Sequence, residues 1–152
     1  MVIVGDGAAS QACGSCSTIA FQPAPYQATY GAAKVFVLSF SQALWQETRH
    51  RGVTVTALCP GPTNTGFVGA LSNAEASQTA IYARLGESGP VVDAGLRALD
   101  HGVPVAVPGL RNQAIAFLPR IAPRRLLTSV SGRLLAPKAA GGVPDGARRA
   151  RP

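Results

Sequence analysis

The hydrophobic positions of this chain predict helices and strands that alternate. Between residues 32 and 44, apolar side chains recur every three or four residues, as on one face of an amphipathic helix, and Gly52 follows as a stop. Val53–Leu58 is rich in β-branched residues and lies between Gly52 and a Pro-Gly-Pro loop at residues 60–62. It therefore predicts a buried strand that directly follows the helix. This order indicates an α/β fold.

The second half of the chain continues the alternation. The predicted elements are a helix over 74–85, a helix from Pro90 to Gly102, a strand over 103–107, a helix over 110–118 and an amphipathic helix beyond Pro123. The first fourteen residues sustain no period, and a glycine-rich dinucleotide fingerprint fails because Ser10 occupies its third glycine position. We expect an atypical segment at 1–14, one domain at 15–136, and a disordered basic tail at 137–152.

Composition narrows the class of protein. A chain of 152 residues that is 47% hydrophobic and 14% charged can bury one core. Three cysteines and no leader pattern argue against a secreted disulfide framework, and no apolar run approaches the roughly 18 residues of a membrane span. We therefore expect a cytoplasmic protein. The pair Cys13-x-x-Cys16 has no second pair to complete a zinc site, so no metal is predicted.

The net charge of +7 belongs to the C-terminal region. Nine of the fourteen basic residues follow Leu110, where Asp145 is the only acid. Few aromatic residues and no recognition motif argue against a specific nucleic-acid partner. A solvated tail is the simplest interpretation, and weak contact with an anionic membrane surface is the alternative. The residues that suggest this contact are Arg124, Arg125, Leu126, Leu127, Val130, Arg133 and Leu134.

Candidate chemistry lies at the start of the long helix. Tyr30 and Lys34 are one turn apart and share a face, and Ser17 precedes Tyr30 by thirteen residues. A phenol has an unperturbed pKa of about 10, and a nearby ammonium favours its phenolate form, which suits acid and base catalysis. On spacing alone, a partly buried tyrosine without a catalytic role is the better interpretation.

A longer pattern favours the catalytic interpretation. It consists of Ser17-Thr18, Phe21-Gln22-Pro23, Tyr30-Gly31-Ala32-Ala33-Lys34 and the segment from Val53 to Thr65, followed by Gly109-Leu110-Arg111-Asn112. With these motifs the chain resembles the classical short-chain dehydrogenase/reductase family, over about Ser15 to Leu135.

The resemblance implies an NAD(P)-dependent oxidoreductase that transfers hydride between nicotinamide and a small carbonyl or alcohol substrate. Tyr30 would be the general acid/base, Ser17 would hydrogen-bond the substrate oxygen, and Lys34 would lower the pKa of Tyr30 and hold the nicotinamide ribose. Pro60, Gly61 and Thr63 would line the nicotinamide, with Thr65 a weaker candidate. The resemblance does not distinguish NAD from NADP as the cofactor. Members of the family often oligomerise through paired long helices, so we expect a homo-oligomer.

The resemblance also implies a partial, Rossmann-like doubly wound parallel sheet, because the family's first strands and its glycine-rich turn have no counterpart here. We therefore interpret the chain as the family's C-terminal portion. Three parallel strands near Cys16, Val55 and Val105 would leave the first with an unpaired edge. The alternative function is a non-catalytic remnant that cannot hold cofactor by itself.

Overall fold

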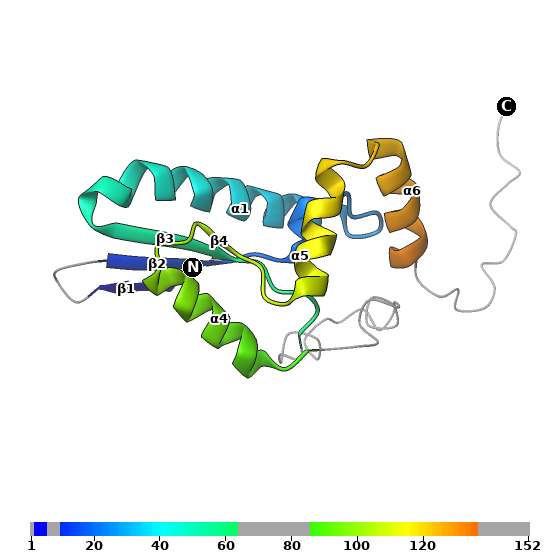
Figure 1. Ribbon diagram of the computed structural model, residues 1–152. Helices are drawn as coiled ribbons and strands as arrows, with labels where there is room; N and C mark the ends of the chain where they lie inside the picture. Colours follow the sequence, from blue (N-terminus) through cyan, green and yellow to red (C-terminus); the bar gives the residue numbers. More distant parts are fainter. Residues whose placement is uncertain (1, 6–9, 64–85, 137–152) are drawn as a thin grey trace, which may run out of the picture.

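The computed structural model describes residues 2–5, 10–63 and 86–136, and these form a sheet between helices (Figure 1). The elements in chain order are β1 (Val2–Gly5), β2 (Ser10–Ser15), η1 (Thr18–Phe21), α1 (Ala28–Thr48), η2 (Arg49–Arg51), β3 (Val53–Leu58), α4 (Ser88–Asp100), β4 (Val105–Ala106), α5 (Leu110–Phe117), η4 (Leu118–Arg120) and α6 (Arg124–Leu135). Figure 1 shows α1 on one face of the sheet and α4 on the other.

Strands β2, β3 and β4 are parallel neighbours in a four-stranded sheet formed by the described residues. The strand predicted near Cys16, the strand at Val53–Leu58 and the strand near Val105 are therefore confirmed. The last is short, Val105–Ala106, because Pro104 has no N–H for the ladder, although its carbonyl accepts from Ala57 N–H at 2.9 Å. This is a partial Rossmann-like α/β fold.

The expectation of an unpaired edge on the first parallel strand was wrong. Strand β1 pairs antiparallel with β2 along its whole length, from Val2 opposite Cys13 to Gly5 opposite Ser10. Val2, Ile3 and Val4 are β-branched and favour a strand, but this run is too short to indicate a partner, so its pairing with β2 was not predicted. Strand β2 itself starts at Ser10, ahead of the domain boundary expected after residue 14.

Helix α1 covers the sheet closely because small residues face it. A Cβ added to Gly14 of β2 would lie 2.6 Å from Ser41 Oγ of α1. The main buried cluster lies between this helix and the strands, and its members are Cys16, Ala20, Leu38, Ala57 and Cys59. A larger side chain at the close contact between Gly14 and Ser41 would push α1 away from the sheet.

Two glycines end helices as the sequence predicted. Gly52, after α1 and η2, has φ of 72°, and Gly102, after α4, has φ of 67°, a left-handed region that suits glycine. Trp45 ties these ends together, because its indole N–H donates to the Gly102 carbonyl at 2.9 Å.

Helix α4 packs against the opposite face of the sheet, where a Cβ on Gly95 would meet the Leu58 side chain at 2.9 Å. Helices α5 and α6 lie beyond the carboxyl ends of the parallel strands (Figure 1). No helix among the described residues is long and apolar enough to cross a bilayer. The predicted helix over 74–85 and the tail at 137–152 lie outside the described residues.

Candidate active site

The site begins where β2 and β3 end. Hydrogen bonds continue past both strands, from Cys16 N–H to the Leu58 carbonyl at 2.8 Å and from Thr18 N–H to the Pro60 carbonyl at 3.0 Å. These bonds hold Ser17 beside the loop that follows β3. Ligands of open α/β sheets bind at the carboxyl ends of the strands, which is where this pair of segments lies.

A cavity of about 350 Å³ opens at this position. It brings together six of the seven site residues that the sequence suggested: Ser17, Tyr30, Lys34, Pro60, Gly61 and Thr63. The seventh, Thr65, lies outside the described residues. Apolar side chains from other elements complete the wall, namely Ile19, Val91, Val92 and Leu135. Segments far apart in the chain therefore share one cavity of a size typical of small-ligand sites.

Tyr30 and Lys34 enter the cavity from the first turns of α1, and both are half-buried. The Lys34 ammonium lies 5.5 Å from the centroid of the Tyr30 ring and donates to the Ser15 carbonyl at 3.2 Å. The strand end therefore positions the charge of Lys34, and the helix repeat positions the phenol next to it. The ammonium therefore lies within cation–π distance of the Tyr30 ring.

Ser17 has a structural role as well as a place in the cavity. Its Oγ accepts from Ile19 N–H at 3.4 Å and caps η1. A hydroxyl carries one donor and two acceptor positions, so this cap uses none of its donor capacity. Ser17 can therefore cap the turn and donate to an oxygen in the cavity.

The loop after β3 is held by backbone bonds, from Thr18 N–H to the Pro60 carbonyl and from Gly86 N–H to the Pro62 carbonyl, both at 3.0 Å, and by side chains. Thr63 Oγ1 donates to the Gly61 carbonyl at 2.8 Å and closes the turn. A Cβ on Gly61 would lie 2.5 Å from Asn112 Oδ1, and Asn112 Nδ2 donates to the Pro108 carbonyl at 2.7 Å. Asn112, in the first turn of α5, thus occupies the space that a side chain at Gly61 would need.

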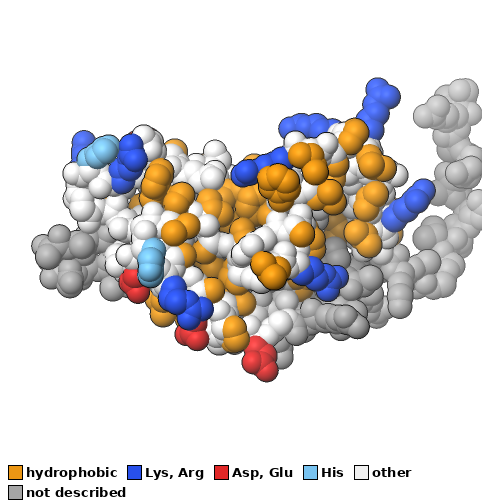
Figure 2. Space-filling model, in the orientation of Figure 1, with side chains coloured by type: hydrophobic (Ala, Val, Ile, Leu, Met, Phe, Trp, Pro, Cys, Tyr) orange, Lys and Arg blue, Asp and Glu red, His pale blue; other side chains and the backbone are white. Residues whose placement is uncertain are grey.

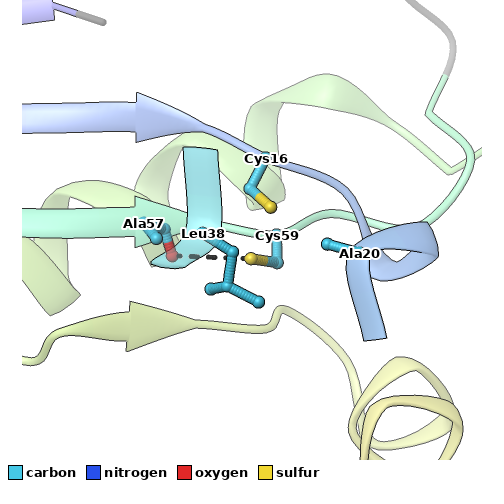
Figure 3. Packing of buried hydrophobic residues seen from close by; sticks show 5 residues of the cluster. All are labelled: Cys16, Ala20, Leu38, Ala57 and Cys59. Carbon is cyan, nitrogen blue, oxygen red and sulfur yellow. Dashed lines mark hydrogen bonds between the residues drawn. The ribbon is translucent and has the colours of Figure 1, made fainter. Parts of the chain in front are cut away.

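Cys16 and Cys59 form a pair of free, buried thiols directly behind the site. Figure 3 shows both sulfur atoms beside Leu38, with Cys16 extending from the end of β2 and Cys59 from the end of β3. A hydrogen bond with Cys59 lowers the pKa of Cys16 to about 7, against the effect of burial and with help from Ser17 backbone and the Lys34 charge. The same bond, together with burial, raises the pKa of Cys59.

This pairing predicts an unusual titration. In a Cys13→Ala background, the ultraviolet absorbance of thiolate should rise through about pH 7, where Cys16 ionises. Cys59→Ala should shift that rise to higher pH, because burial still disfavours the Cys16 thiolate after its donor is lost. A rise through the same pH in both variants would contradict the pairing.

Sequence reasoning missed two contributors to the site. Asn112 was part of a quoted motif but had no assigned role, and its importance depends on contact with a loop some fifty residues earlier. Cys16 was considered only as one half of an incomplete zinc pair, although its position next to Ser17 was a signal of its place in the cavity wall.

Part of the chain is similar to a known protein family. Residues 11–76 match the short chain dehydrogenase family profile, a range that includes Ser17, Tyr30, Lys34 and the loop after β3. The matches support the short-chain dehydrogenase family. The part of the chain that matches lies toward its N-terminus, so the interpretation as a C-terminal portion stays a prediction. No curated protein shows significant sequence similarity to the chain.

Solved short-chain dehydrogenases share the fold. A short-chain dehydrogenase from Sphingobium yanoikuyae in complex with NADPH is 26% identical, with a TM-score of 0.57, over 89% of this chain and 48% of that one. A 7β-hydroxysteroid dehydrogenase is 21% identical over 80% and 47% of the two chains, with a TM-score of 0.64. A Burkholderia cenocepacia short chain dehydrogenase in complex with NADP is 24% identical over 84% and 49%, with a TM-score of 0.62.

The chain therefore spans about half the length of these short-chain dehydrogenase structures. The profile match and the Sphingobium structure support an oxidoreductase kind and the use of a nicotinamide cofactor within the family. The two less similar structures support the fold alone.

Proposed function

We propose that this chain carries the reaction centre of an NAD(P)-dependent oxidoreductase acting on a carbonyl or alcohol substrate. The observation that supports it is the single cavity shared by Ser17, Tyr30 and Lys34 with the loop after β3. In this cavity, the three polar side chains that would take part in proton transfer lie opposite a loop that presents backbone atoms and small side chains.

The chemistry of the lining residues fits the nicotinamide end of a dinucleotide. Lys34 brings an ammonium with three donors, one of which already reaches Ser15, and ribose hydroxyls accept such donors well. Pro60, Gly61 and Thr63 would lie along the ring, and Thr65 is proposed with them. When bound, the cofactor supplies or accepts the hydride.

The protein's own residues would handle the proton and the position of the oxygen. Tyr30 would donate a proton to the substrate oxygen during reduction and remove one during oxidation, with the Lys34 charge stabilising its phenolate. Ser17 would donate to the same oxygen while it caps η1. The apolar wall of Ile19, Val91 and Leu135 would exclude water.

The first test is a titration of the chain with NADPH and NADH, followed by nucleotide fluorescence. Lys34→Ala should weaken binding by roughly tenfold, the value of a hydrogen bond to a charged group. Arg97→Ala, which removes an exposed cation from α4, is the control and should bind as the wild type does. If the folded chain binds neither nucleotide, the proposal fails and the remnant interpretation is favoured.

We also propose that the chain self-associates through α1. Phe36 and Phe40 stack with ring centroids 5.6 Å apart, and both are exposed together with Val35 on the same helix. An exposed aromatic cluster of this kind is typical of an interface.

A further inference from the structure

A second exposed apolar surface lies on the far end of the molecule. Leu126, Val130 and Leu134 recur at every fourth residue of α6, and each is exposed. Leu118 of η4 and Ile121, the residue that follows this turn, are also exposed. We call these five residues the α6 apolar face. Figure 2 shows hydrophobic side chains gathered in this region, with Lys and Arg side chains around them.

The opposite stripe of α6, rather than the exposed one, packs against the described part of the chain. Leu127, Ser131 and Leu135 are buried, and Leu135 lines the cavity of the candidate site. Leu127 therefore does not belong to the membrane-facing set that the sequence suggested. Helix α6 therefore has two apolar faces. The described part of the chain covers one of them and leaves the other exposed.

The charge around the face has a single sign. Arg120, Arg124, Arg125 and Arg133 lie on η4 and α6, and the sequence holds no Asp or Glu between residues 101 and 136. Helix α4 differs, because its exposed Val92 and Leu96 are accompanied by Asp93 and Asp100.

We propose that the α6 apolar face docks on an anionic lipid surface. Apolar side chains flanked only by arginines match a bilayer, where the side chains enter the headgroup boundary and the guanidinium groups pair with phosphates. A second copy of this chain is a poorer occupant, because it would bring arginines against arginines. The inference is independent of the proposed reaction.

Co-sedimentation with vesicles tests the docking directly. The chain should bind vesicles of phosphatidylcholine and phosphatidylglycerol, bind phosphatidylcholine alone much less, and be released by salt. Leu126→Gln combined with Leu134→Gln should weaken binding by about tenfold or more, because both side chains leave the lipid boundary. Arg124→Gln combined with Arg125→Gln should lower it on the order of tenfold through lost charge.

The matched control is Leu96→Gln combined with Val103→Gln, two exposed apolar residues that do not line the cavity. Those side chains are 55% and 40% exposed, against 57% and 49% for Leu126 and Leu134, so the amount of exposed apolar surface removed is similar. A melting curve for each variant verifies the fold. Equal loss in both double variants, or no binding by the folded wild type, would overturn the proposal. Two other results would also overturn it. One is vesicle binding that is lost only when the tail arginines are neutralised (Arg148, Arg149, Arg151), and the other is a dimer of the chain that Leu126→Gln dissociates.

Discussion

Tyr30→Phe should lower carbonyl reduction with NADPH by about 10²- to 10⁴-fold, the usual contribution of a positioned general acid or base. The substitution removes the hydroxyl that would transfer the proton and keeps the ring that lies 5.5 Å from the Lys34 ammonium. Nucleotide affinity should therefore change little. Steady-state kinetics with a set of small ketones, together with the fluorescence titration, would separate the two effects.

Tyr26→Phe is the matched control for this loss. Tyr26 lies just before α1, close in sequence to Tyr30 in the first turn, but its side chain is 70% exposed and does not line the cavity. It should keep the wild-type rate. A Tyr30→Phe chain that remains as fast as the wild type would remove Tyr30 from the mechanism, and a slow chain with lost nucleotide binding would indicate a structural role.

Gly61→Ala should destabilise the fold by about 1–3 kcal/mol, as overpacking of a tight contact does. The new Cβ would lie 2.5 Å from Asn112 Oδ1, and the amide cannot move away without weakening its 2.7 Å hydrogen bond to the Pro108 carbonyl. Urea unfolding would measure the loss. Because the loop also lines the cavity, nucleotide affinity should fall with stability.

Asn112→Ala separates the effect of crowding at residue 61 from the other effects of the Gly61→Ala substitution. In the double variant the obstacle is gone, so Gly61→Ala should cost much less free energy of unfolding than it does alone. The coupling between the two substitutions should therefore be favourable. Costs that simply add would show that the contact between the loop and α5 is not what requires glycine at this position.

Local pattern was enough for most of the regular elements. The helix that became α1, the strand Val53–Leu58 and the stops at Gly52 and Gly102 follow from periodicity and from the conformational freedom of glycine. Helix α4 begins at Ser88, two residues before the predicted proline start. Strand β1 was not predicted, because its run of three β-branched residues is too short to indicate a partner, and its pairing with β2 depends on the tertiary structure.

The candidate residues were visible as a motif, but their arrangement was not. A separation of four on a helix places Tyr30 beside Lys34 whatever the fold. No spacing rule places Ser17 next to Pro60, since that depends on the register of β2 against β3 and on the bonds that continue beyond it. The same register brings Cys16 against Cys59 and changes the pKa of both thiols.

Local patterns in the sequence were enough to predict the α/β class, the main helix and strand, and the pairing of a phenol with an ammonium. Each of these predictions rests on residues that are close to one another in the chain. The tertiary structure alone decided the pairing of β1, the shared cavity and the contact of Asn112 with Gly61. It also divided α6 into a buried stripe and an apolar stripe facing outward. Each of these depends on which distant segments pack together, and that is set by the burial of the whole core rather than by any local pattern.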